Sequence, residues 1–197
     1  AVAMAGLEEK IIDSDFYVTC TGIYTHYDDY RPTCTGVHGS LNVVYALYNS
    51  CNIFFYETSR LLGIEKLNDY FTMFGLGEET GVEIGESKGI VDSVEFRTEK
   101  GGLWTPVKSV MSSDYSETLY SSETQILSKA DFSDKNWDLV YDGMILVGTK
   151  SYADFSSVPV TVAAKTGTTT VKKAGNGSKK EVNNGLIIAL APADNPQ

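Results

Sequence analysis

The stretch VTVAAKTGTT (residues 160–169) joins an apolar, β-prone run to a Lys-Thr-Gly-Thr tetrapeptide. Its first six residues alternate between two faces, and this period of two is typical of a half-buried strand. The pattern predicts that Lys165 points away from the buried face, so that its ammonium is free to meet a ligand. Gly167 has no side chain, so another backbone can approach this edge. These residues predict either a strand that displays a lysine to a ligand or an ordinary hairpin strand with a solvated lysine.

A second motif, Ser50-Cys51-Asn52, lies between two helical patterns. Ser-x-x-Lys, Ser-Asp-Asn and Lys-Thr-Gly form the signature set of penicillin-binding proteins and class A β-lactamases. Ser50-Cys51-Asn52 resembles the middle motif and Lys165-Thr166-Gly167 the last. The segments 49–56 and 189–196 also resemble the transpeptidase domain of class B penicillin-binding proteins. The resemblance covers most of the chain, and the two motifs occur in the order of that family.

The first motif of the set is not found in the chain. Residues 1–9 resemble the body of the nucleophile helix of the family, whose Ser-x-x-Lys lies a few residues before this segment. Neither Ser87-Lys88 nor Ser128-Lys129 has the required spacing. We therefore expect the nucleophile upstream of residue 1 and a domain clipped at both ends. By the same argument, the chain alone should be inactive.

The resemblance implies a fold and a reaction. The expected fold is α+β, a penicillin-binding and β-lactamase-like transpeptidase domain over residues 1–197 with an antiparallel sheet packed against helices. The implied reaction is D,D-transpeptidation of the D-Ala-D-Ala stem peptide of peptidoglycan, which β-lactams inhibit. It implies a membrane-anchored parent on the extracytoplasmic face of a bacterial membrane, with cell-wall synthesis partners and a role in cell shape. A β-lactamase or D,D-carboxypeptidase, and a non-catalytic β-lactam sensor, are the alternatives.

The resemblance also assigns roles in a serine acyl transfer. Ser50 would relay a proton, Asn52 would hold the upstream lysine and the peptide amide, and Lys165 would supply positive charge near the substrate carboxylate. A Ser50 that only caps a helix is the alternative for that residue. The residues expected to bind the substrate follow the lysine on the same strand: Thr166, Gly167 and Thr168.

Length and charge narrow the remaining possibilities. A chain of 197 residues is long enough for one domain with a real core. The formal net charge of −10 argues against nucleic acid or an anionic membrane surface as a partner. No apolar run reaches the roughly 18 residues that a membrane span needs.

Hydrophobic periodicity and breaker residues predict the order of elements. Expected helices cover residues 1–12, 41–49, 53–62, 64–74 and 134–147, and expected strands cover 160–169 and 185–191. Ser40 and Gly63 are expected to cap helices. A short strand or turn at 81–86 and a loop at 101–106 complete the pattern. At Pro106-Val107 the sequence departs from the family, which predicts a missing segment at this junction.

The segment 13–39 shows no helical period, and a loop of this length is uncommon unless it is functional or tied down. It contains two of the three cysteines, Cys20 and Cys34. An odd number of cysteines is unusual outside the cytoplasm, where thiols are usually paired. One hypothesis is a disulfide between Cys20 and Cys34 that leaves Cys51 as a buried thiol.

The other hypothesis is a structural zinc site formed by Cys20, Cys34, His38 and Cys51. Three cysteines and one histidine make a closed tetrahedral site, which would pin the loop against the Ser50 turn. This arrangement resembles a metal site of some class B penicillin-binding proteins. There the metal is held by the histidine before the helix that leads to the Ser-x-Asn motif and by the cysteine inside that motif. The resemblance therefore supports His38 and Cys51 more directly than the other two, where acidic residues can serve. Catalysis itself should need no cofactor.

Overall fold

The computed structural model describes residues 1–79, 89–91, 109–111, 118–121, 131–150, 155–173 and 180–194. The expectations for 81–86, 101–106 and the junction at 106–107 lie outside the described residues. Among the described helices, none combines the length and the apolar character needed to cross a bilayer.

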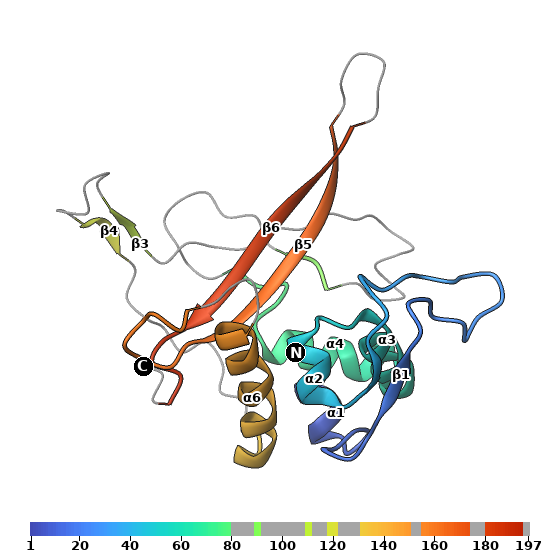
Figure 1. The fold of residues 1–197 in the computed structure, drawn as a ribbon. Helices are drawn as coiled ribbons and strands as arrows, with labels where there is room; N and C mark the ends of the chain where they lie inside the picture. Colours follow the sequence, from blue (N-terminus) through green and yellow to red (C-terminus); the bar gives the residue numbers. More distant parts are fainter. Residues whose placement is uncertain are drawn as a thin grey trace.

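The helices gather at one end of the molecule, and a long two-stranded hairpin rises from them (Figure 1). The helices of the described part are α1 (Val2–Glu8), α2 (Val43–Tyr48), α3 (Asn52–Leu62), α4 (Ile64–Met73) and α6 (Asp134–Lys150). Gly63 ends α3 with a φ of 82°, a left-handed conformation that favours glycine, so the expected cap is confirmed.

Every described strand pair is antiparallel. The pairs are β1 (Val18–Cys20) with β2 (Gly39–Leu41), β3 (Ser109–Met111) with β4 (Thr118–Ser121), and β5 (Ala163–Lys173) with β6 (Lys180–Leu190). In the long hairpin, Lys165 lies opposite Ile188. The α+β class with antiparallel pairing is therefore confirmed.

The main core lies between α1, α2 and α3. Phe54 on α3 is fully buried and meets Phe16 edge-on, with 5.9 Å between ring centroids. Burial of such a side chain contributes roughly 1.5–3 kcal/mol. Thr58, one turn further along α3, is also fully buried, and its hydroxyl donates to the Phe54 carbonyl at 2.9 Å. This core fixes the start of α3, where the second motif lies.

Helix α6 connects this core to β5 through two glycines. A Cβ atom at Gly143 would lie 2.6 Å from Leu47 Cβ, and one at Gly148 would lie 2.2 Å from the Val162 carbonyl oxygen. Both separations are shorter than real Cβ contacts, so only glycine permits this approach. The helix thus packs against α2 and against the start of β5, and it sets the distance between the two motifs.

The expected helix at 1–12 is too long, because α1 ends at Glu8. Lys10 has a φ of 56°, and the amides of Ile11 and Ile12 both donate to the Gly6 carbonyl, at 2.9 and 3.1 Å. This turn breaks the helix while it still buries Ile12. The apolar pair that indicated a longer helix therefore reaches the core from a turn.

Ser40 does not cap a helix, contrary to expectation, because it lies in β2. The N-cap of α2 is Asn42, whose side chain accepts a hydrogen bond from the Tyr45 amide at 3.3 Å. The pairing of β1 with β2 also gives the segment 13–39 strand structure that its sequence did not indicate.

The expected alternation along 160–165 is wrong as well. Val162, Ala163 and Ala164 are all buried, whereas Val160 is exposed, and β5 begins only at Ala163. Two consecutive buried alanines mean that the strand is covered on both faces where it passes the helices.

Candidate active site and thiol cluster

The Ser50 turn joins α2 to α3. Its backbone closes with two hydrogen bonds, from the Ser50 amide to the Leu47 carbonyl at 3.3 Å and from the Cys51 amide to the Ala46 carbonyl at 2.9 Å. Ser50 itself has a φ of 50°, in the left-handed region. For a residue other than glycine this conformation costs of order 1 kcal/mol, so the surrounding contacts must hold it.

Lys165, on β5, contacts this turn. Its Nζ donates to Ser50 Oγ, 115 positions away in the sequence, and to the Thr166 carbonyl at 2.6 Å. The lysine is half-buried, and this burial lowers its pKa. The structure thus brings together two of the residues that the motifs singled out, and it replaces the solvated-lysine alternative with a lysine bound to Ser50.

Asn52, the third of these residues, is the first residue of α3. Its side-chain Nδ2 donates to the Thr33 carbonyl at 3.2 Å, and its backbone amide donates to Cys34 Sγ at 3.2 Å. Both partners belong to the loop between β1 and β2. This loop therefore holds the position of Asn52.

The expected substrate-binding residues follow Lys165 on β5. Thr166 is half-buried, whereas Gly167 and Thr168 are exposed. Among the described strands only β6 pairs with β5, so the other edge of β5 is unpaired within that part of the chain. An edge of this kind can bind an extended peptide through its main chain.

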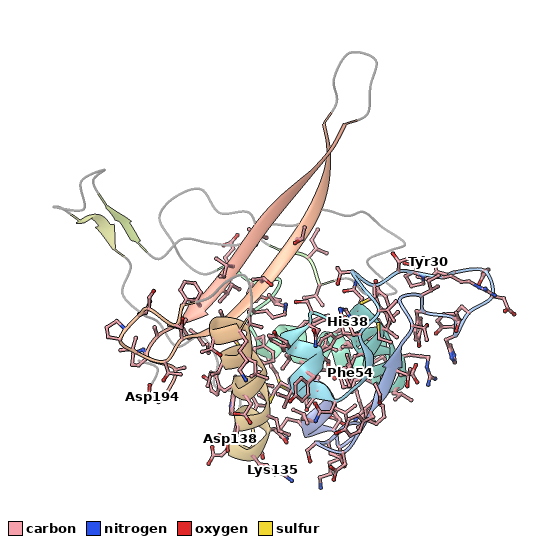
Figure 2. All side chains as sticks on the ribbon, in the orientation of Figure 1. Tyr30, His38, Phe54, Lys135, Asp138 and Asp194 are labelled. Atoms are coloured by element: carbon pink, nitrogen blue, oxygen red, sulfur yellow. The ribbon has the colours of Figure 1, made fainter. Side chains whose placement is uncertain are left out.

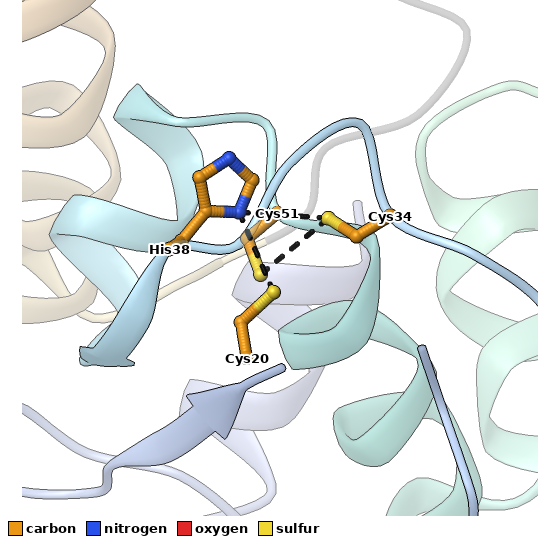
Figure 3. Close-up of side chains that lie close together, drawn as sticks. All are labelled: Cys20, Cys34, His38 and Cys51. Atoms are coloured by element: carbon orange, nitrogen blue, oxygen red, sulfur yellow. Dashed lines mark hydrogen bonds between the residues drawn. The ribbon is translucent and has the colours of Figure 1, made fainter. Parts of the chain in front are cut away.

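A cluster of three cysteines and one histidine lies directly behind the Ser50 turn; Figure 3 shows these four side chains converging. The thiol cluster consists of Cys20 at the end of β1, Cys34, His38 before β2, and Cys51. Its four ligand atoms all lie within 4.8 Å of one another. The folding of the loop thus gathers residues that are up to 31 positions apart, from 20 to 51.

All three cysteines are free, so the alternative disulfide between Cys20 and Cys34 is absent from the structure. Burial raises the pKa of the Cys34 thiol, but backbone N–H groups of Gly36, Ile53 and Asn52 outweigh it and lower this pKa to about 6. Burial, together with the neighbouring thiols, raises the pKa of Cys51 to about 12. The cluster therefore favours a charged sulfur at Cys34 and a neutral one at Cys51.

The distances in the thiol cluster fit a tetrahedral metal site. His38 Nδ1 lies 3.5 Å from both Cys20 Sγ and Cys34 Sγ, and the sulfurs of Cys34 and Cys51 lie 4.0 Å apart. With Zn–S near 2.3 Å and Zn–N near 2.0 Å, tetrahedral geometry places two sulfurs about 3.8 Å apart and a sulfur about 3.5 Å from a nitrogen. These four residues could hold a zinc ion without large movements.

Sequence reasoning missed a polar network that ties the same loop to α3. Tyr24 donates its hydroxyl to Glu57 at 2.6 Å, and Arg60 binds both carboxylate oxygens, at 2.6 and 3.0 Å. The Arg60 hydrogen bonds, together with that from Tyr24, lower the pKa of Glu57 to about 2 despite its partial burial. The spacing of Glu57 and Arg60 on a helix was a signal for their pairing. No local pattern indicated Tyr24.

The family model described as the penicillin binding protein transpeptidase domain matches residues 1–197, the whole chain. The chain belongs to this transpeptidase family. It is a domain of the class B type, and the resemblance seen in the motifs is confirmed.

Curated relatives of this transpeptidase domain include the peptidoglycan D,D-transpeptidase MrdA of Acinetobacter baumannii, 25% identical over 99% of the chain, and MrdA of Escherichia coli, 25% identical over 81%. The matched regions are 36% and 33% of those proteins, so the chain spans about a third of their length.

Solved structures share the fold. PBP2 of Pseudomonas aeruginosa has a TM-score of 0.72 at 20% identity, over 100% of this chain and 52% of that one. PBP2 of Helicobacter pylori, solved in a complex with MreC, has a TM-score of 0.73 at 19% identity, over 100% of this chain and 42% of that one.

Proposed function

We propose that the full-length protein is a peptidoglycan D,D-transpeptidase that works by serine acyl transfer. The observation that carries this proposal is the contact between Lys165 and Ser50. It brings together the Lys-Thr-Gly motif and the Ser-x-Asn motif of the family signature. Relatives that bear the name peptidoglycan D,D-transpeptidase support it. The nucleophilic serine and its lysine would come from a segment upstream of residue 1.

In this proposal the upstream serine attacks the carbonyl of the D-Ala-D-Ala peptide, and Ser50 passes a proton to the leaving group. The Lys165 ammonium hydrogen-bonds to Ser50 Oγ, which orients the hydroxyl and places positive charge where negative charge develops. Asn52, held by Thr33 and Cys34, presents its amide to the substrate and to the upstream lysine. Thr166 and Thr168 bind the substrate carboxylate.

The proposal also implies where the protein acts and what it binds. The substrate is the peptidoglycan stem peptide, with β-lactams as mimics, so the enzyme would act on the extracytoplasmic face of a bacterial membrane to which it is anchored. The complex of the structural relative PBP2 with MreC supports a partner among cell-wall synthesis proteins. The net charge of −10 argues against nucleic acid as a partner.

We also propose that the thiol cluster holds one structural zinc ion. The separations of its donor atoms support this, as do the burial of Cys20 and Cys51 and the absence of a disulfide among the three cysteines. When bound, the ion would cross-link β1, the loop and the Ser50 turn. It would take no part in the reaction.

Covalent labelling of the full-length protein by a fluorescent penicillin tests the activity. Lys165→Ala should abolish labelling, because it removes the cation beside Ser50. Asn52→Ala should reduce labelling strongly, because it removes the side-chain amide that the proposal assigns to the substrate and the upstream lysine. Lys172→Ala, on the same strand, and Lys179→Ala are matched controls that should label normally. Near-normal labelling of the Lys165→Ala protein would contradict the proposal.

Two further measurements test the assignment of the motifs and distinguish a transpeptidase from a β-lactamase. The chain of 197 residues alone should not be labelled, because the proposal places the nucleophile upstream of residue 1; a labelled residue within it would contradict the assignment of the motifs. A transpeptidase should keep its penicilloyl ester for hours, whereas rapid deacylation would indicate a β-lactamase.

A further inference from the structure

We propose that Cys34 and Cys51 form a reversible disulfide, which makes the thiol cluster a site of oxidative modification that controls the Ser50 turn. The formation of this disulfide does not depend on the proposed function. Its effect on acylation does rest on that function, and the experiments below separate the two.

The geometry favours this pair of cysteines. Their sulfurs lie 4.0 Å apart, so about 2 Å of approach would bring them to the S–S bond length. Cys34 belongs to a loop that lies outside the strands, and it is the partly exposed member of the three, whereas Cys20 and Cys51 are 1% and 0% exposed. Cys34 is therefore the thiol that an oxidant from solution reaches first.

Cys20 differs from Cys34 in lying within a paired strand and in being buried. It is the last residue of β1, where it pairs with Gly39, and its sulfur also contacts the Gly36 carbonyl and His38 Nδ1, each at 3.5 Å. Cys51 lies one peptide bond from the Asn52 amide that donates to Cys34 Sγ. This hydrogen bond directs the Cys34 sulfur toward the Ser50 turn, and in this proposal Cys51 is therefore the resolving thiol.

The chemistry needs an oxidant, and a small-molecule disulfide such as oxidised glutathione is sufficient. The Cys34 thiolate attacks one sulfur of oxidised glutathione, a Cys34–glutathionyl bond forms, and the first glutathione thiolate leaves. Cys51 then attacks the Cys34 sulfur and expels the second glutathione, and the proton of the Cys51 thiol passes to this departing thiolate. Two protein thiols are oxidised, and one glutathione disulfide is reduced to two thiols.

The consequence falls on the active-site motif because Cys51 is its middle residue. A movement of Cys51 toward Cys34 pulls on Ser50, whose left-handed conformation depends on its surroundings, and on Asn52. The contact between Lys165 and Ser50 should then be lost. A metal ion on the cluster would occupy the same sulfurs, so metal binding and disulfide formation exclude each other.

The first test uses the purified protein with oxidised glutathione, after treatment with a chelator and separately after loading with zinc. Intact mass and peptide mapping without reductant should show the loss of two hydrogen atoms and a peptide linked through Cys34 and Cys51. Zinc should slow this product at least several-fold. A Cys20-linked disulfide as the main product, or a mixed disulfide that never resolves, would overturn the proposal.

Single substitutions assign the order of events. Cys20→Ser should still form the disulfide. Cys51→Ser should stop with one glutathionyl group on Cys34, and Cys34→Ser should stay reduced. If Cys34→Ser took up glutathione on Cys51 as fast as the wild type, the assigned order would be wrong. A urea-denatured sample is the control, and it should give all three pairings without preference.

The second test labels the full-length protein with fluorescent penicillin before oxidation, after oxidation and after reduction with dithiothreitol. Labelling should fall at least tenfold on oxidation and return on reduction. A mapped Cys34–Cys51 disulfide with unchanged labelling would refute control of the Ser50 turn. If the reduced protein is never labelled, the proposed function fails while the mapped disulfide still stands.

Discussion

Replacing Glu57 by Gln tests how firmly the loop of the thiol cluster is bound to α3. The carboxylate accepts hydrogen bonds from Tyr24 on the loop and from Arg60 on the helix. Glutamine keeps the shape of the side chain but removes its charge. We therefore expect the protein to fold with a lower free energy of unfolding at neutral pH, and we expect the loop to be cleaved faster by protease.

The pKa shift sets the magnitude. A fall from 4.5 to about 2 corresponds to at most about 3.4 kcal/mol, at 1.36 kcal/mol for each pKa unit. The side chains of Arg60 and Glu57 are 29% and 23% exposed, so screening by solvent reduces the expected loss to roughly 1–2 kcal/mol. Urea denaturation at pH 7 measures this difference between the two proteins.

The pH dependence of the stability difference between wild type and Glu57→Gln can refute this reasoning. Because folding depresses the pKa of Glu57, its stabilising effect is present above pH 4.5 and is lost as the pH falls toward 2. The difference between wild type and Glu57→Gln should thus shrink by more than half near pH 3. A difference that is the same at pH 7 and pH 3, or below about 0.3 kcal/mol at both, would refute the reasoning. Tyr24→Phe, which removes one hydrogen bond and no charge, is the matched control and should cost less.

Further predictions concern the metal and the packing of α6. Protein purified without chelator should contain about one zinc ion per chain by elemental analysis, and His38→Ala should lose it; a Cys20–Cys34 disulfide with no bound metal would contradict the site. Gly148→Ala should cost roughly 1–3 kcal/mol in urea denaturation, because its Cβ would lie 2.2 Å from the Val162 carbonyl. Gly185→Ala, where nothing lies within 4 Å of the added atom, is the control and should change stability little.

The helices that the sequence predicted best are those with both a period and a local stop signal. Helices α3 and α4 agree with their expected ranges to within one residue at each end, since the apolar stripe and Gly63 are both local features. By contrast, β1 and β2 depend on each other across the loop between them. Three-residue strands carry no period, so their pairing is decided by the tertiary structure.

The sequence predicted residues of the candidate site only where they belong to a motif or to the pattern of cysteines. The motifs indicated Ser50, Asn52 and Lys165 without any knowledge of the space between them, and the structure brings Lys165 to Ser50. The number and spacing of the cysteines indicated the four residues of the thiol cluster but left a disulfide open. Tyr24 could not be predicted, because its partner Glu57 lies 33 positions away and the two share no pattern.

The Ser50 turn is held from two sides, so a loop that lies outside the motif contributes to its conformation. On one side, Lys165 on β5 binds Ser50 Oγ; Figure 2 shows β5 and β6 rising from the end of the molecule where the helices lie. On the other side, Cys34 and Thr33 accept the two hydrogen bonds of Asn52. Ser50 adopts a left-handed conformation that costs of order 1 kcal/mol, and such a conformation persists only where contacts on both sides enforce it. Releasing the loop should therefore relax Ser50 away from Lys165 even though every residue of the motif is still present.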